Sequence, residues 1–156
     1  MTTLKTPTDI GSREDVESLV NHFYNKVRKD TLIGPIFDEV VKIDWETHLP
    51  KMYNFWETVL LGSNSFRGNP LGAHMALTAE TEMSWPKFQR WLQLFNETLD
   101  DLFQGERTEH ARRGAEDMAN VIYSRINNVP DPRFDPANLT PEQRARYSRY
   151  KATNPE

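Results

Sequence analysis

The segment Asn69-Pro70-Leu71-Gly72-Ala73-His74-Met75-Ala76-Leu77 separates two long helical patterns, each of which carries a stripe of aromatic and aliphatic side chains. Asn69 and Pro70 are typical of a helix cap and first turn, because an asparagine side chain accepts a hydrogen bond there and a proline needs to donate none. We expect a short helix of about one or two turns. The segment therefore places a single imidazole, that of His74, between two apolar helix faces.

An amphipathic helix is predicted near the start of the chain. Ser12 followed three residues later by Asp15 resembles a capping box, in which the two ends of a first turn satisfy each other's backbone donors. Gly34 and Pro35 break the helical pattern and predict a loop over residues 30–37. Spacings of three and four place the apolar residues of this helix on one face: Val16, Leu19, Val20, Phe23, Tyr24 and Val27.

A second long helix is predicted between that loop and Gly62, a residue typical of a helix C-terminus. Because Pro50 is tolerated best in a first turn, we expect the regular helix to begin near a Thr47 cap, after a separate turn at residues 44–46. Its apolar face carries Trp45, His48, Leu49, Met52, Phe55, Trp56, Val59 and Leu60.

Two more helices are predicted after the His74 segment. One starts near Ser84 with Pro86 in its first turn and ends at Gly105, and the other ends near Pro130. No stretch alternates with period two for long enough to predict a sheet, so the fold class is all-α. The first of these helices buries Phe88, Trp91, Leu92, Phe95, Leu99 and Leu102, and the second Ala111, Ala115, Met118, Ala119, Ile122 and Ile126.

Length and composition limit the class of protein. The 156 residues suit one helical domain at residues 1–129, followed by a proline-containing C-terminal extension at 130–156 with a short polar helix. The chain has no cysteine, which excludes disulfides and thiolate-held zinc, iron–sulfur clusters or haem. With 19 basic and 23 acidic residues interspersed, nucleic acid is not an expected partner. We expect no membrane association and a cytoplasmic location, since no apolar leader or spanning run is visible.

The four histidines differ in their surroundings. His22 lies beside the apolar stripe of the first helix and His110 lies in a polar first turn, so both are expected to be solvated. His48 shares a stripe with apolar residues, where an unsatisfied polar group costs about 1 to 3 kcal/mol. Two interpretations of His48 stay open: a boundary side chain that reaches solvent, and a gate or hydrogen-bond donor beside a ligand.

Tyr24 and Trp91 bring a hydroxyl and an indole N–H onto apolar faces. Each alone fits an ordinary core aromatic bonded to the backbone, but with His48 they are easier to explain around one shared polar ligand. A haem held by one proximal histidine, His74, offers such a ligand on its opposite face when it binds dioxygen. A charge-assisted hydrogen bond of about 1.5 to 3 kcal/mol would slow the loss of dioxygen roughly tenfold to a hundredfold, which suits redox chemistry better than transport.

Six motifs stand out along the chain: Phe23-Tyr24-Asn25-Lys26-Val27-Arg28-Lys29-Asp30, Gly34-Pro35-Ile36-Phe37, Asn54-Phe55-Trp56, Leu60-Leu61-Gly62, Asn69-Pro70-Leu71 before His74, and Trp91-Leu92-Gln93-Leu94-Phe95. With these motifs the chain resembles, over residues 12–128, a known family, the third group of truncated hemoglobins. The absence of the glycine pairs found in the loops of other groups agrees with this resemblance.

The resemblance implies a two-over-two sandwich of α-helices around haem b, with His74 as the proximal ligand of the iron. It implies that Tyr24 and Trp91 bond the bound ligand on the distal side and that His48 swings toward solvent. The resemblance also implies that Phe37 stacks on the porphyrin and that Met52, Phe55, Leu71 and Ile122 line the apolar pocket.

The ligands implied are dioxygen, carbon monoxide, nitric oxide or related small molecules, with an electron donor if the chemistry is peroxidase-like or directed at nitric oxide. Lys51, about one turn beyond His48, and Arg67, before the His74 segment, are candidate partners of the haem propionates. Alternatives stay open: an oxygen carrier, a ligand sensor whose tail responds, or a haem-free helical interaction module. The extension at 130–156 could be solvated, cover the haem edge or join two copies in a homodimer.

Overall fold

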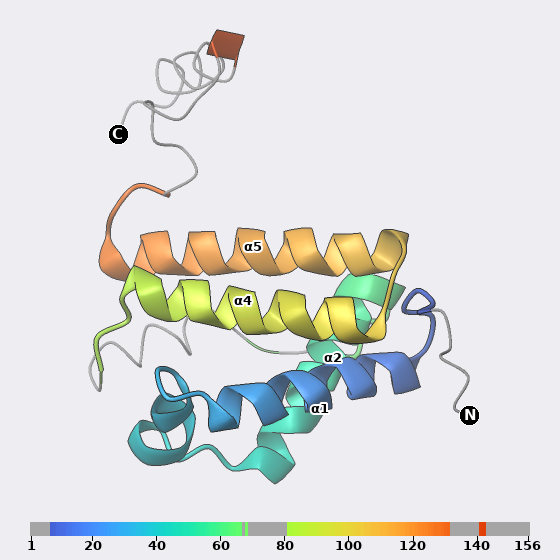
Figure 1. Cartoon of the computed structure of the whole chain (residues 1–156), viewed down its shortest axis with the longest axis horizontal. Helices are drawn as coiled ribbons and strands as arrows, with labels where there is room; N and C mark the ends of the chain where they lie inside the picture. The colour runs from blue at the N-terminus through green and yellow to red at the C-terminus, as the bar shows by residue number, and fades with distance from the viewer. Residues whose placement is uncertain (1–6, 67, 69–80, 132–140, 143–156) are drawn as a thin grey trace.

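A computed structural model describes residues 7–66, 68, 81–131 and 141–142 (Figure 1). Its elements are α1 (Arg13–Lys29), the π-helical turn η1 (Ile36–Val40), α2 (Trp45–Leu61), α4 (Trp85–Leu102) and α5 (Glu106–Asn127). Within these residues, β structure is limited to one bridge between Thr8 and Phe103. None of the described helices is both long and apolar enough to cross a membrane.

The four long helices form two pairs. Helix α1 packs on α2, and α4 runs antiparallel to α5 (Figure 1). The pairs meet through contacts of α1 with α4 and of α2 with α5. This arrangement confirms the all-α class and the two-over-two architecture.

The start of α1 follows its predicted capping pattern. The Ser12 hydroxyl accepts a hydrogen bond from the Asp15 backbone N–H at 3.2 Å. The Asp15 carboxylate accepts one from the Gly11 N–H at 2.8 Å, one residue earlier than in a standard capping box. One of the first donors of the helix is thereby satisfied, and the predicted Ser12 cap is confirmed.

The predicted start of α2 at a Thr47 cap is wrong. The helix begins at Trp45, and its cap is Asp44, whose carboxylate accepts hydrogen bonds from the Glu46 N–H at 3.2 Å and from the Thr47 hydroxyl at 2.9 Å. Asp44 therefore outcompetes Thr47 as the cap, and Pro50 lies inside the helix. The other end is as predicted, since Gly62 closes the helix with a left-handed φ of 73°.

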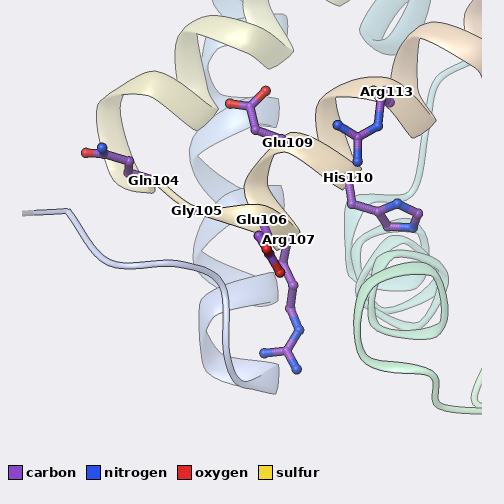
Figure 2. Close-up of a pocket in the computed structure, with 7 residues that line it drawn as sticks. All are labelled: Gln104, Gly105, Glu106, Arg107, Glu109, His110 and Arg113. Carbon is purple, nitrogen blue, oxygen red and sulfur yellow. The ribbon is translucent and has the colours of Figure 1, made fainter.

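The turn between α4 and α5 is held by a residue from the other end of the chain. The Asp9 carboxylate accepts hydrogen bonds from the Arg107 and Thr108 backbone N–H groups, both at 2.9 Å, and from the Thr108 hydroxyl at 2.8 Å. Gly105 opens α5 rather than ending α4 as predicted, because α4 stops at Leu102. A Cβ on Gly105 would lie 2.4 Å from Asp9 Cγ, so the cap requires glycine here. Figure 2 shows this turn, which borders an open surface hollow.

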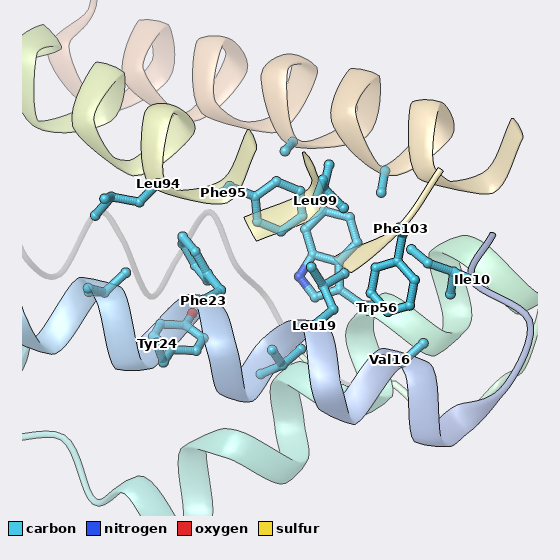
Figure 3. Packing of buried hydrophobic residues seen from close by; sticks show 14 of the residues in the cluster. Ile10, Val16, Leu19, Phe23, Tyr24, Trp56, Leu94, Phe95, Leu99 and Phe103 are labelled. Atoms are coloured by element: carbon cyan, nitrogen blue, oxygen red, sulfur yellow. The ribbon is translucent and has the colours of Figure 1, made fainter. Parts of the chain in front are cut away.

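The main core lies between α1, α2, α4 and α5 (Figure 3). Ala111 and Ala115 are fully buried, which lets α5 approach closely, as the small residues predicted. A smaller cluster joins the start of α4 to the end of α5 and contains Met83, Phe88, Ala119 and Ile122. The largest fully buried side chains of the main core are Phe23, Phe95, Ile10, Leu19 and Leu99.

Candidate functional site

Tyr24 lies at the point where α1, η1 and α2 converge. Its side chain is 7% exposed, and its ring meets those of His48 at 5.4 Å and Phe37 at 6.0 Å between centroids, both edge to face. A tyrosine hydroxyl is already protonated at neutral pH, and burial raises the pKa of the Tyr24 hydroxyl further above its ordinary value. Tyr24 is thus a buried donor suited to a ligand.

The π-helical turn η1 presents Phe37 to Tyr24, and sequence periodicity did not predict it. Gly34 lets the chain turn sharply after α1, since a Cβ there would lie 2.9 Å from the Val27 and Arg28 carbonyl oxygens. The wider turn is closed by a hydrogen bond from the Val41 N–H to the Ile36 carbonyl at 2.9 Å. It leaves Ile36 buried and the Phe37 ring half-buried beside Tyr24.

His48 is half-buried on the inner side of α2, one turn after the start of the helix. Its ring meets Tyr24 and, at 5.6 Å, Trp45. This position favours a role beside the Tyr24 hydroxyl over that of an isolated boundary histidine. Met52 and Phe55 follow on the same helix and pack half-buried against the core.

Trp91 reaches the same region from α4. Its ring stacks on Phe95 at 5.5 Å with an interplanar angle of 7°, and meets the edge of Phe23 at 5.3 Å. Phe23 in turn contacts Tyr24 at 4.9 Å. The structure therefore brings Tyr24 and His48 into direct contact and links Trp91 to them through Phe23.

The other predicted site residues have varied surroundings. Ile122 is buried in the smaller core cluster, and Lys51 is exposed on α2. His74, Leu71 and Arg67 lie outside the described residues.

His22 and His110 are exposed, as predicted, and His22 Nδ1 lies 2.7 Å from the Ser18 carbonyl oxygen. His110 borders the surface hollow at the α4–α5 turn, together with Arg107 and Arg113 (Figure 2). Among the predicted site residues that the structure describes, none lines this hollow, and the described residues hold no group of three or more potential metal ligands.

Sequence reasoning missed the contribution of Trp45 to this site. The spacing of three residues placed Trp45 on the same helical face as His48, but nothing in the sequence assigned it to the site. In the structure its ring contacts Tyr24 at 5.3 Å and stacks near Phe37 at 5.9 Å.

Comparison with known proteins defines the class of fold and site. A family model for bacterial-like globins matches residues 8–124. A group 3 truncated hemoglobin, ctb, from Campylobacter jejuni is 34% identical over 121 residues, which cover 76% of this chain and 84% of that protein. The crystal structure of a group III truncated hemoglobin from the same organism matches with a TM-score of 0.68 and 30% identity, over 78% of this chain and 95% of that one.

The chain therefore belongs to the bacterial-like globins, and within them to the group III truncated hemoglobins. Membership of a globin family implies that the protein binds haem. The described residues are suited to haem. Tyr24 supplies a buried hydrogen-bond donor. Half-buried apolar faces that a flat cofactor can cover are offered by Phe37, Met52, Phe55 and Trp91.

Proposed function

We propose that this globin binds haem b through His74 and retains a small diatomic ligand beside Tyr24, with Trp91 as a second donor. The observation that carries the proposal is the Tyr24 side chain, which is buried, keeps its hydroxyl proton and has its ring in contact with the rings of His48 and Phe37. Dioxygen, carbon monoxide and nitric oxide are the ligands of this chemical class.

The cofactor would be held by apolar contacts and by charges at its edge. Met52 and Phe55 on α2 and Phe37 in η1 are the described residues of the proposed pocket, which also includes Leu71 and Ile122. Lys51 is exposed, as a partner of a propionate at the solvent edge must be. Arg67 is the second proposed partner. When bound, haem supplies reversible ligand binding and one-electron redox chemistry.

The role of the distal residues follows from their protonation and burial. Tyr24 donates a hydrogen bond to the bound ligand, and its raised pKa prevents ionisation from removing that donor. The Trp91 indole N–H can only donate, which suits an electron-rich ligand. His48 packs against Tyr24 and limits the access of water.

Retention of this kind favours redox turnover over release. A charge-assisted hydrogen bond contributes about 1.5 to 3 kcal/mol, which slows ligand loss roughly tenfold to a hundredfold. A carrier must release dioxygen readily, whereas peroxidase-like or nitric oxide chemistry gains from a long-lived complex. We therefore propose redox chemistry with a separate electron donor.

Absorption spectra test the haem site. Wild type, His74→Ala and the exposed-residue control His110→Ala are purified with excess haem and measured in the ferric, ferrous and carbonmonoxy states. We expect a haem band sensitive to carbon monoxide in wild type and His110→Ala, and its loss or alteration in His74→Ala. An unchanged His74→Ala spectrum contradicts the proximal assignment, and colourless wild type contradicts haem binding.

A further inference from the structure

Trp45 is fixed from the solvent side by two charged residues, which come from two other elements. Its indole Nε1 donates a hydrogen bond to Asp38 Oδ1 in η1 at 3.0 Å. The Arg28 guanidinium, at the end of α1, lies 4.8 Å from the centroid of the Trp45 ring. Arg28 Nε also lies 3.5 Å from the same Asp38 oxygen. The three side chains close a triangle that spans α1, η1 and α2.

The Trp45 ring also contacts aromatic side chains of the proposed ligand site. It contacts Tyr24 at 5.3 Å and His48 at 5.6 Å, and it is nearly parallel to Phe37, with an interplanar angle of 28°. Trp45 is half-buried, whereas the side chains of Asp38 and Arg28 are 36% and 49% exposed. The indole therefore contacts two exposed charged side chains and also the ring of the buried Tyr24.

The contacts that hold the indole are individually weak, because exposed ion pairs and exposed cation–π contacts are screened by water. They also act on different parts of one side chain, the ring face and the ring N–H, so together they set its orientation. A cover held in this way can open without disturbing the core beneath it.

We propose that Trp45 is a cover over the ligand site, and that the Arg28–Asp38 pair sets how often it opens. This proposal rests on the proposed function. Trp45 acts here as a positioning residue: it holds the rings of Tyr24 and His48 and limits the passage of a diatomic ligand from solvent.

The test compares wild type with Arg28→Gln and Asp38→Asn. The matched control is Arg13→Gln, because Arg13 also lies on α1 with its guanidinium 5.7 Å from an aromatic ring, that of Tyr53, and pairs with Glu57 at 3.2 Å. Carbon monoxide rebinding after flash photolysis gives the bimolecular association rate. We expect Arg28→Gln and Asp38→Asn to raise it roughly twofold to fivefold, as for the loss of one exposed cation–π or ion-pair contact, and Arg13→Gln to leave it unchanged.

A second measurement follows the opening of Trp45 itself, through solvent exchange of its indole N–H. The Trp45 indole N–H resonance of the carbonmonoxy protein, assigned with Trp45→Phe, should exchange faster with solvent in Arg28→Gln but not in Arg13→Gln. If Arg28→Gln and Asp38→Asn both show the association rate and the indole N–H exchange rate of wild type, the proposed cover is overturned while haem binding remains intact. Wild type without a carbonmonoxy spectrum overturns the proposed function itself, and the cover with it.

Discussion

Gly105 shows how a single residue without a side chain joins distant parts of this chain. Its φ of 148° and ψ of −173° belong to a region open essentially only to glycine. A Cβ there would also collide with Asp9. The residue thus permits both the tight turn and the cap on α5, although sequence reasoning used it only as the end of the preceding helix.

We predict that Gly105→Ala lowers the free energy of unfolding by about 1 to 3 kcal/mol, because it strains the backbone and displaces Asp9. Gly114→Ala is the matched control: it lies in the interior of α5, where a Cβ would meet only Val59 Cγ1 at 4.0 Å. The control should raise stability by about 0.5 to 1 kcal/mol. Urea unfolding measures both, and equal effects of the two substitutions would contradict this account of Gly105.

Helix α5 begins with a cap supplied from outside the helix. Burial acts to raise the pKa of the Asp9 carboxyl, but hydrogen bonds from Arg107 and Thr108 outweigh it and hold the pKa below the ordinary value. A lowered folded-state pKa means that Asp9 contributes stability above its unfolded pKa and loses it as the pH falls through the folded value.

We predict that Asp9→Ala destabilises the protein by about 0.5 to 2 kcal/mol near neutral pH, the usual effect of losing a helix cap. The difference from wild type should stay constant above about pH 5 and shrink as the pH falls below the ordinary carboxyl value of 3.8. Denaturant unfolding across a range of pH checks this. The control is Glu116→Gln, at an exposed position on α5, the helix that Asp9 caps, and it should have no effect. A difference independent of pH would exclude the ionised carboxylate as the cap.

The helices and turns differ in how well local sequence signals predicted them. Local signals sufficed for α1, whose Ser12 cap and apolar spacing coincide, and for the end of α2 at Gly62. They failed at η1, since a π-helical turn has no periodic signature and depends on Phe37 and Asp38 meeting Trp45 from another element. Tertiary contact, rather than local preference, determines that part of the fold.

At the scale of the whole molecule, one aromatic cluster connects the core to the proposed site. Phe95 lies at its centre, stacked on Trp56 of α2 at 4.9 Å and on Trp91 of α4, with the edge of Phe23 of α1 at 5.2 Å. The side chain is 1% exposed. Packing within the core and the placement of Trp91 therefore depend on the same ring.

We predict that Phe95→Ala costs about 3 to 5 kcal/mol of unfolding free energy, because it leaves a cavity among three packed rings. Leu32→Ala, at a side chain that is 39% exposed, should change stability by less than about 0.5 kcal/mol. Thermal or urea unfolding of the haem-loaded proteins gives both values. A small effect of Phe95→Ala would mean that the cluster does not stabilise the fold.

The site could be predicted in part. Tyr24, His48 and Trp91 stood out as polar groups on apolar faces, and the structure places Tyr24 against His48 and links Trp91 to them through Phe23. The roles of His74, Leu71 and Arg67 remain predictions, because these residues lie outside the described part of the chain. The role of Trp45 could not be assigned from sequence, since Arg28 and Asp38, which orient its ring, come from two other elements.

The rate of dioxygen dissociation tests the central claim most directly. It is measured by rapid mixing for wild type, Tyr24→Phe and the control Tyr53→Phe, whose hydroxyl bonds to Asn21 on the outside of the molecule. The account predicts a rate roughly tenfold to a hundredfold higher in Tyr24→Phe and an unchanged rate in Tyr53→Phe. A rate in Tyr24→Phe equal to that of wild type would contradict the claim that the buried Tyr24 hydroxyl retains the ligand.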